Sequence, residues 1–209
     1  MKLFFSPGAC SMSPHIVAQE LGIPVTLEKV DLANKKLATG GADFWAINPK
    51  GYVPALLLDN GELLTEGPTI VQYLADSKPE AGLIPANGTL PRYRVQEMLG
   101  YINSEIHKSF SYLFNPKTAP ETRKDREEHL HKRFALLDAR LASQPYLFGE
   151  KFSVADAYLF TVASWAKHVK LDLSAFPNLL AFLGRVAARP AVQAALVAEG
   201  LVPAPAANA

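Results

Sequence analysis

The chain has 209 residues, 49% of them hydrophobic, which is enough for one large domain or two small ones with a packed interior. Its 21 basic and 20 acidic residues leave a formal charge of +1, so no general electrostatic field attracts nucleic acid or anionic lipid. The sequence has no uncharged apolar run of about 18 residues, the length of a membrane-spanning helix. The single cysteine, Cys10, has no internal disulfide partner, which is typical of a reducing compartment. We therefore expect a cytoplasmic protein that binds neither nucleic acid nor membrane.

The first thirty residues have the pattern of a strand, a helix and a second strand. Residues 2–5 form a short apolar run, and residues 25–30 alternate in polarity as a strand does. Between them, Ser13 and Pro14 are typical of a helix start and Gly22 of a helix end. We therefore expect a βαβ unit with a cysteine just before its helix.

The next patterned segment predicts a hairpin followed by a helix. The apolar runs 55–58 and 62–64 flank Asp-Asn-Gly, and an Asn-Gly pair favours the positive φ angles of a tight turn. Pro68 suits a first helical turn, so the helix should begin at about residues 66–68. Its free N–H groups and positive dipole end can hold a carboxylate, and Gly67 allows close approach.

Val53 and Pro54 stand at the entry to the first hairpin strand. Proline cannot donate to a strand ladder, and a cis peptide here would turn the Val53 backbone outward, where it could pair with a peptide. The whole order is βαβ and then ββα, which predicts a small mixed sheet with helices on its faces. That order matches a thioredoxin-like domain.

The second half of the chain reads as helices only. We place a domain boundary in the turn-rich segment 78–88, beyond which helical periodicity has no competing strand pattern. Apolar residues recur every three or four positions over 95–113, and again over 130–141. Two more helices are expected at 177–189 and 190–199.

A capping pattern predicts one further, buried helix. Ser153 is followed three positions later by Asp156, a variant of the capping box that has Asp in place of Glu or Gln. The helix should run from Val154 to about His168. Three aromatic residues on this mostly apolar helix are interpreted as core rather than as a ligand cage: Tyr158, Phe160 and Trp165.

Three motifs, in order and at matching spacing, carry a family resemblance. They are Ser-Pro-Gly-Ala-Cys-Ser at residues 6–11, Val-Pro with the hairpin and Thr-Glu-Gly before a helix, and Glu-Ile-His-Lys-Ser-Phe at 105–110. The chain, up to about Val202, resembles the cytosolic glutathione S-transferases, and is similar to their bacterial beta class. The resemblance implies a thioredoxin-like glutathione-binding domain at 1–79, an all-α domain lining the electrophile site at 88–202, and a flexible tail at 203–209.

Cys10 is the residue most directly suited to chemistry. A helix N-terminus favours thiolate, and Ser13 stands where a thioredoxin would have its second cysteine, so exchange between two cysteines of the chain is impossible. A mixed disulfide with an external thiol, or a hydrogen bond to a bound thiolate, remains open. The alternative is a small buried apolar residue. Ser11 is a second candidate donor to a sulfur, or else a residue of the helix start.

His107 lies one position off the apolar stripe of the helix over 95–113. It shares a polar line with Gly100, Asn103, Ser104 and Ser111. A lone helical histidine is usually a surface or core residue, but this one matches the family's His-Lys motif.

The resemblance implies a role for each matching position. His107 and Ser104 border the thiol site, Lys35 reaches the glycyl end of glutathione, and Val53 pairs with the cysteinyl backbone. Glu66 and Gly67 bind the γ-glutamyl end, which carries an ammonium beside a carboxylate. The full predicted site is: catalytic Cys10, His107 and Ser11; glutathione-binding Cys10, Lys35, Val53, Pro54, Glu66, Gly67, Asn103, Ser104 and His107. Gly100 departs from the family, which often has Asn there.

The expected function is conjugation of the glutathione thiolate to small apolar electrophiles, for detoxification, by a cytoplasmic homodimer. Glutathione is then the co-substrate, and no metal is expected. Two alternatives stay open: a glutathione-dependent thiol oxidoreductase or reductive dehalogenase that uses Cys10, and a non-catalytic binding module with the same fold.

Overall fold

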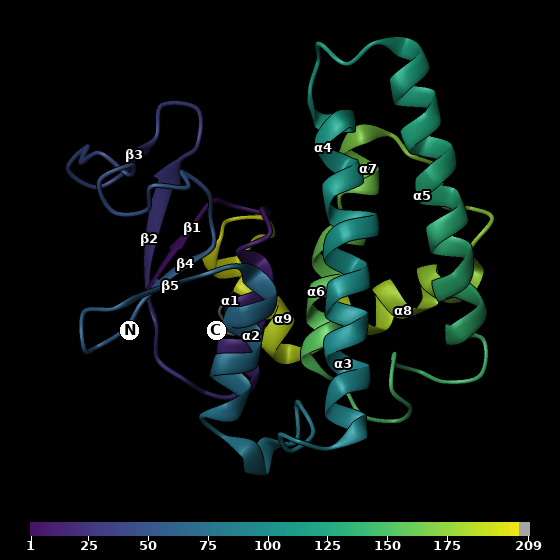
Figure 1. Ribbon diagram of the computed structural model, residues 1–209, viewed down its shortest axis with the longest axis horizontal. Helices are drawn as coiled ribbons and strands as arrows, with labels where there is room; N and C mark the ends of the chain where they lie inside the picture. Colours follow the sequence, from purple (N-terminus) through teal and green to yellow (C-terminus); the bar gives the residue numbers. More distant parts are fainter. Residues whose placement is uncertain (205–209) are drawn as a thin grey trace, which may run out of the picture. The chain divides into compact units, whose positions relative to one another are not determined.

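The computed structural model describes residues 1–204, which form two compact units (Figure 1). The first is Met1–Lys78 with the segment that begins at Ala188, and the second is Pro79–Ala187. The sequence predicts one helical domain over 88–202, whereas helix α9 (Pro190–Ala198) packs against helix α1 (Met12–Glu20) of the first unit. Periodicity identifies an apolar helix face but not the surface that it packs on. Residues 205–209 of the predicted tail lie outside the described part.

The first unit is built on a mixed five-stranded sheet in the order β3-β2-β1-β4-β5. Its strands are β1 (Lys2–Phe5), β2 (Thr26–Asp31), β3 (Lys36–Leu37), β4 (Ala55–Leu57) and β5 (Leu63–Thr65). The central strand β1 is parallel to β2 and antiparallel to β4, and the other pairs are antiparallel. The predicted βαβ and ββα order is therefore confirmed. The two-residue strand β3 was not predicted, because it is too short to show an alternating pattern.

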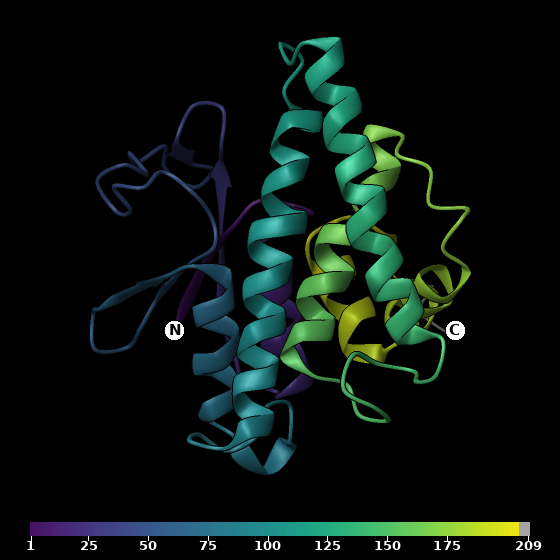
Figure 2. The same cartoon turned by 45° about the vertical axis from the view of Figure 1, so that its right-hand side comes forward.

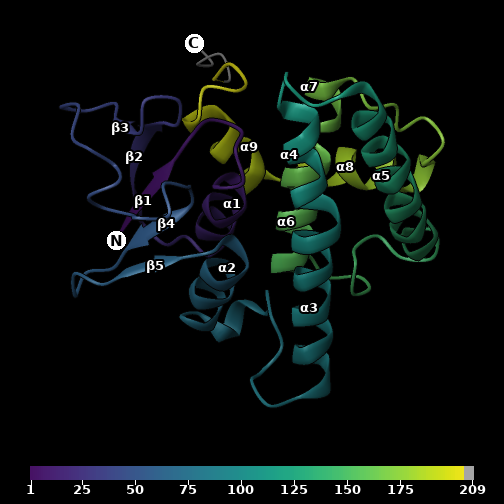
Figure 3. The same ribbon diagram turned by 45° about the horizontal axis from the view of Figure 1, so that its top comes forward.

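Helices cover one face of this sheet and an irregular segment covers the other. Helices α1 and α2 (Gly67–Asp76) lie on the same face, as Figures 1 and 3 show. On the opposite face, the fully buried Phe44 packs with Phe4 and Val53. Side chains alternate along a strand, so one apolar strand can supply both layers.

The second unit is helical throughout. It contains a 3₁₀ turn Pro79–Ala81, α3 (Leu90–Tyr101), a π-helical segment Ile102–His107, α4 (Lys108–Phe114), α5 (Pro120–Leu141), α6 (Val154–Ala163), α7 (Ala166–Val169) and α8 (Pro177–Ala187). The predicted single helix over 95–113 is one continuous rod in Figure 2, but its middle is π-helical. Ile102 and Ile106 are fully buried in that middle part, as the apolar stripe predicts.

Helix α6 is the buried centre of this unit, and all ten of its residues are buried. The predicted capping box is confirmed: the backbone N–H and the hydroxyl of Ser153 both donate to Asp156 Oδ2, at 2.8 and 2.6 Å. The predicted extent to His168 is wrong, because the helix ends at Ala163 and α7 starts only at Ala166. Tyr158, Phe160 and Trp165 are core residues, as expected.

Within the described residues, no single helix has both the length and the apolar character needed to cross a membrane. One pair, α8 and α9, reaches the required length and hydropathy only when the two are counted together across the break between them.

Candidate active site

Cys10 lies in the turn between β1 and α1, two residues before the helix begins. The half-buried thiol donates a hydrogen bond to the Val53 carbonyl, with 3.0 Å between Sγ and the oxygen. A thiol can donate such a bond and a thiolate cannot, so this contact favours the protonated cysteine. The helix N-terminus acts in the opposite direction. Two predicted site residues, a thiol and a backbone carbonyl, are thus brought together.

Serine hydroxyls hold the loop that carries this thiol. The fully buried Ser11 accepts from the Ser6 N–H at 3.2 Å and donates to the Ser6 carbonyl at 3.3 Å. Ser11 is also the N-cap residue of α1, so the geometry favours the alternative, a residue of the helix start, over the predicted donor to sulfur. Ser13 was expected to cap α1, and that is wrong: its hydroxyl donates to the Cys10 carbonyl at 3.0 Å, and the N-cap position is Ser11.

A buried carboxylate from the C-terminal segment holds the same loop. Glu199 accepts from the Gly8 N–H at 2.9 Å, and its other oxygen lies 2.9 Å from His15 Nδ1. The His15 and Glu199 side chains are 1% and 0% exposed. Sequence reasoning missed this cluster, because residues 184 positions apart share no local pattern.

The hairpin supplies the backbone for a peptide ligand. The Val53–Pro54 peptide is cis, as the sequence suggested. Helix α2 begins at Gly67 with Pro68 in its first turn, so the predicted helix N-terminus is confirmed. A Cβ at Gly67 would make only ordinary contacts, at 3.7 Å to Pro54 and 3.9 Å to Ser13, so packing inside the protein does not demand a glycine there.

Glu66 occupies the N-cap position of this helix and has a positive φ of 71°, which is unusual for a residue with a side chain. Its carboxylate is 58% exposed and pairs with Lys50 Nζ at 2.7 Å. Positive φ is costly for a residue with a Cβ, and such strain is commonest at functional sites. Lys50, which also donates to Thr65, was not predicted as part of the site.

Lys35 reaches the loop before the cis peptide. Its ammonium donates to the Gly51 carbonyl at 2.9 Å and lies over the rings of Trp45 and Tyr52, at 5.7 and 5.4 Å from their centroids. Gly51 has φ of 67°, and a Cβ there would come within 2.4 Å of the Trp45 ring. The two aromatics therefore hold the ammonium close to the hairpin entry.

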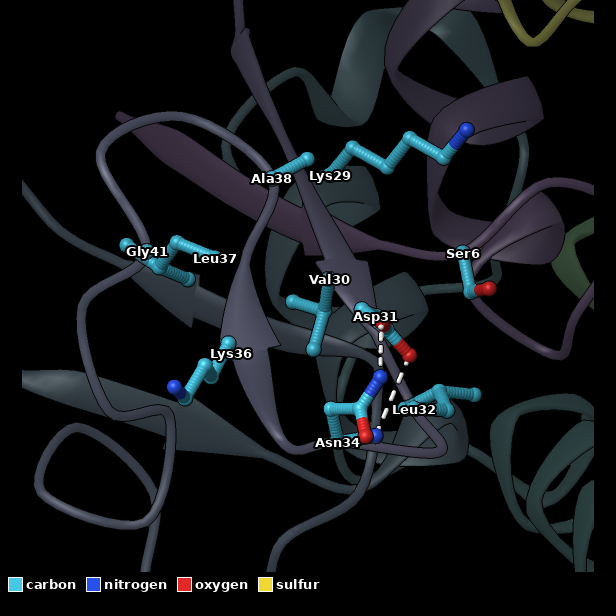
Figure 4. Close-up of a pocket in the computed structure, with 10 residues that line it drawn as sticks. All are labelled: Ser6, Lys29, Val30, Asp31, Leu32, Asn34, Lys36, Leu37, Ala38 and Gly41. Carbon is cyan, nitrogen blue, oxygen red and sulfur yellow. Dashed lines mark hydrogen bonds between the residues drawn. The ribbon is translucent and has the colours of Figure 1, made fainter.

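The residues on either side of Lys35 in the sequence line a polar pocket of about 780 Å³ (Figure 4). Asn34 and Lys36 line it, whereas Lys35 between them is directed to Gly51. The Asn34 amide donates to Asp31, and hydrogen bonds from Asn34 hold the pKa of Asp31 below its usual range. None of the predicted site residues lines this pocket.

The second unit presents His107 at the end of the π-helical segment. His107 Nδ1 lies 2.6 Å from the hydroxyl oxygen of Tyr158, which in turn donates to Asn103 Oδ1 at 2.9 Å. The edge of the His107 ring also packs on Trp165, with 5.0 Å between centroids. The structure thus joins Asn103 and His107 through a tyrosine that was predicted only as core. Ser104 is exposed on the same segment.

These two units define a class of protein: a thioredoxin-like fold with a thiol at the first helix, joined to a helical unit that carries a half-buried histidine beside a buried tyrosine. The family model for the N-terminal domain of glutathione S-transferase matches residues 8–77, and that for the C-terminal domain matches residues 101–190.

Individual relatives are similar to this protein over nearly its full length. Glutathione S-transferase GstA of Escherichia coli O157:H7 is 48% identical over 201 residues, 96% of this chain and 100% of the relative. A bacterial beta-class enzyme of Sphingomonas chungbukensis is 50% identical, with a TM-score of 0.93 over 97% and 100% of the two chains. A sphingomonad glutathione S-transferase solved in complex with glutathione is 48% identical, with a TM-score of 0.92 and the same coverage.

The chain therefore belongs to the glutathione S-transferase family, in its bacterial beta class. It is an enzyme of that family, a transferase of alkyl or aryl groups, and glutathione is its co-substrate.

Proposed function

We propose that this enzyme conjugates the thiolate of glutathione to small apolar electrophiles, and so disposes of reactive compounds. The observation that carries the proposal is the hydrogen bond from Cys10 to the Val53 carbonyl. It places a thiol beside the outward backbone that the family resemblance pairs with the cysteinyl residue of glutathione. In this proposal the first unit binds glutathione, and the helical unit, Pro79–Ala187, supplies the wall for the electrophile.

Each part of glutathione meets a suitable group in this assignment. The N-terminus of α2, at Gly67, takes the γ-glutamyl carboxylate, and the exposed carboxylate of Glu66 takes the neighbouring ammonium. Lys35 takes the glycyl carboxylate, and Val53 with the cis Pro54 holds the cysteinyl backbone.

The chemistry requires the sulfur of glutathione to be ionised before it attacks the electrophilic carbon. His107, with Asn103 and Ser104 beside it, would accept the thiol proton. Cys10, with its S–H turned from the Val53 carbonyl towards glutathione, would donate to the resulting thiolate. Donors of this kind contribute about 1 to 3 kcal/mol each to a buried anion.

Cys10 also supports a second function, exchange of thiols and disulfides. Its thiolate can attack one sulfur of glutathione disulfide, forming a mixed disulfide and releasing one glutathione thiolate. The half-buried thiol beside the glutathione backbone site is the feature that favours this reaction. Reductive dehalogenation through the same cysteine is a related possibility. The relatives are named as transferases, which favours conjugation and disfavours a non-catalytic module.

We place the enzyme in the cytoplasm, where glutathione is reduced, and propose that it forms a two-fold symmetric dimer. The charged segment 123–133 of α5 is a candidate for the dimer contact, and its alternative is a solvated helix face. There, Arg123 donates to the carbonyls of Leu113 and Val169, and Arg126 pairs with Asp125 within the chain. These charges are satisfied internally, which weakens the support for that particular face. Light scattering at micromolar concentration should give twice the mass of the chain, and a monomer would contradict the dimer.

Retention on glutathione-agarose, combined with a chromogenic chloronitrobenzene assay, tests the proposed conjugation. His107→Ala should lower kcat by about 10- to 100-fold, because one stabilising group for the thiolate is lost, while retention on the resin persists. His131→Ala is a matched control, since that histidine lies on a different helix, α5, and contacts the Asp172 carbonyl. Retention without any conjugation by the wild-type enzyme would contradict the proposal.

A further inference from the structure

The hydroxyl of Tyr158 is the link between two predicted site residues, Asn103 and His107. Tyr158 is 1% exposed and lies on the buried helix α6. Its hydroxyl donates to Asn103 Oδ1 at 2.9 Å, and the same oxygen lies 2.6 Å from His107 Nδ1. Both contacts lie within the helical unit.

The hydrogen bonds that join Asn103, Tyr158 and His107 determine the tautomer of His107. A phenol has one proton, and here it is donated to Asn103, so the Tyr158 oxygen can only accept from His107. His107 Nδ1 must therefore carry a hydrogen. A neutral imidazole carries only one such hydrogen, so Nε2 has the lone pair. This is the reverse of the tautomer that free imidazole side chains prefer in water.

Local structure holds all three groups in place. Asn103 and His107 are four residues apart in the π-helical segment, where the Lys108 N–H bonds to the carbonyl of Asn103, five residues earlier. Residues four apart on a helix share one side, so both polar groups reach the same hydroxyl. The Trp165 edge contact at 5.0 Å restricts rotation of the His107 ring.

We propose that Tyr158, through Asn103, is a positioning residue that fixes His107 as the Nδ1–H tautomer and so makes Nε2 the proton acceptor. The proposal rests on the proposed role of His107 towards the glutathione thiol. In that step the S–H bond breaks and an Nε2–H bond forms, giving a thiolate and an imidazolium whose Nδ1–H still donates to Tyr158. The His107 ring needs no reorientation, because Nε2 is already the unprotonated nitrogen before the substrate binds.

The test is the tautomer of His107 in the intact enzyme, read from the ¹⁵N spectrum of its imidazole and assigned by comparison with His107→Ala. The wild type should show a protonated Nδ1 and an unprotonated Nε2 at neutral pH. Tyr158→Phe removes only the hydroxyl and should shift the population towards Nε2–H. Asn103→Ala should do the same, because the tyrosine proton can then rotate to His107 Nδ1.

The kinetic prediction is a split between kcat and KM. Tyr158→Phe should lower kcat for conjugation by about 3- to 10-fold, the range expected for loss of one hydrogen bond, and leave the KM for glutathione within about twofold. Tyr101→Phe is the matched control, since Tyr101 ends α3, just before the π-helical segment, and its hydroxyl donates to the Arg133 carbonyl of α5. It should change neither the tautomer nor kcat.

A wild-type His107 that is mainly Nε2–H would overturn the proposal, even if a variant failed to fold. So would an unchanged tautomer in Tyr158→Phe accompanied by a fall in kcat, which would indicate a packing role only. The spectrum is recorded without glutathione, so it stays informative even if the conjugation assay fails.

Discussion

At the level of single residues, Glu66 combines a strained backbone with an exposed carboxylate. Its φ of 71° is held at the start of α2, and its ion pair with Lys50 is more than half exposed at both ends. Exposed ion pairs contribute little to stability, so we infer that the strained Glu66 serves a ligand rather than the fold.

Glu66→Ala should therefore weaken glutathione binding by about 10- to 100-fold, the loss of one charge-assisted hydrogen bond. The readout is the rise in melting temperature at a fixed glutathione concentration, which follows from binding to the folded state alone. Lys50→Ala is the control, because it removes the competing cation and leaves the carboxylate in place. An unchanged shift in Glu66→Ala would show that the γ-glutamyl site is elsewhere.

The residues that could be predicted from the sequence are those whose role follows from a local pattern. Gly67 and Pro68 mark a helix start, and Val53-Pro54 marks a strand entry, so the structure reproduces both. Tyr158 was missed as a site residue because its pattern is that of an apolar core helix. A hydroxyl inside such a helix needs a partner, and only the fold shows that the partner is His107.

Among the elements, helix α6 carries a titration that should affect stability. Burial raises the pKa of Asp156 to about 6, even though the Leu147 and Ser153 donors lower it. The folded protein then binds this proton more tightly than the unfolded chain, so the contribution favours folding at low pH and is lost as pH rises through 6.

The free energy of unfolding of the wild type, relative to Asp156→Asn, should therefore fall by about 2 kcal/mol between pH 4 and about pH 7, and be constant above. Urea unfolding at a series of pH values measures this difference, with the variant as the reference that does not titrate at this position. A difference that is independent of pH, or that grows with pH, would show that the buried carboxyl does not titrate in this window.

Helix α9 and the segment after it fix the cysteine loop through a buried carboxylate. Glu199→Ala would leave the Gly8 N–H and the His15 ring without their acceptor in a buried site. We expect a loss of about 2 to 5 kcal/mol in the free energy of unfolding, measured in urea. Glu20→Ala, which removes the partially exposed partner of Arg189, is the control and should cost clearly less. Equal losses would mean that the buried cluster contributes no more than the partly buried Arg189–Glu20 pair.

Helices and strands could be predicted where apolar residues recur at one regular spacing. They could not be predicted where tertiary contacts determine the structure. The hairpin and the stripe of α5 follow directly from sequence patterns, since Leu130, Phe134, Leu137 and Leu141 are all buried. The π-helical turn over Ile102–His107 keeps the same apolar spacing as an α-helix, so periodicity cannot reveal it. The docking of α9 onto α1 depends on contacts far apart in the chain.

At the scale of the whole molecule, one thiol site supports two proposed reactions, conjugation and thiol–disulfide exchange. Conjugation needs the sulfur of glutathione to be ionised and unbound, whereas a mixed disulfide with Cys10 would block it. Both cannot be the same catalytic state. The central claim is that conjugation is the main activity and that Cys10 assists it without being essential.

The most direct test is the rate of chloronitrobenzene conjugation by Cys10→Ala, with glutathione adducts followed by mass spectrometry. We predict that the adduct and the exchange with a small disulfide are lost, while conjugation persists with kcat lower by about 5- to 100-fold, because His107 and backbone donors still stabilise the thiolate. Complete loss of conjugation with glutathione binding intact would contradict this account, and would make Cys10 the essential group of a redox enzyme or dehalogenase.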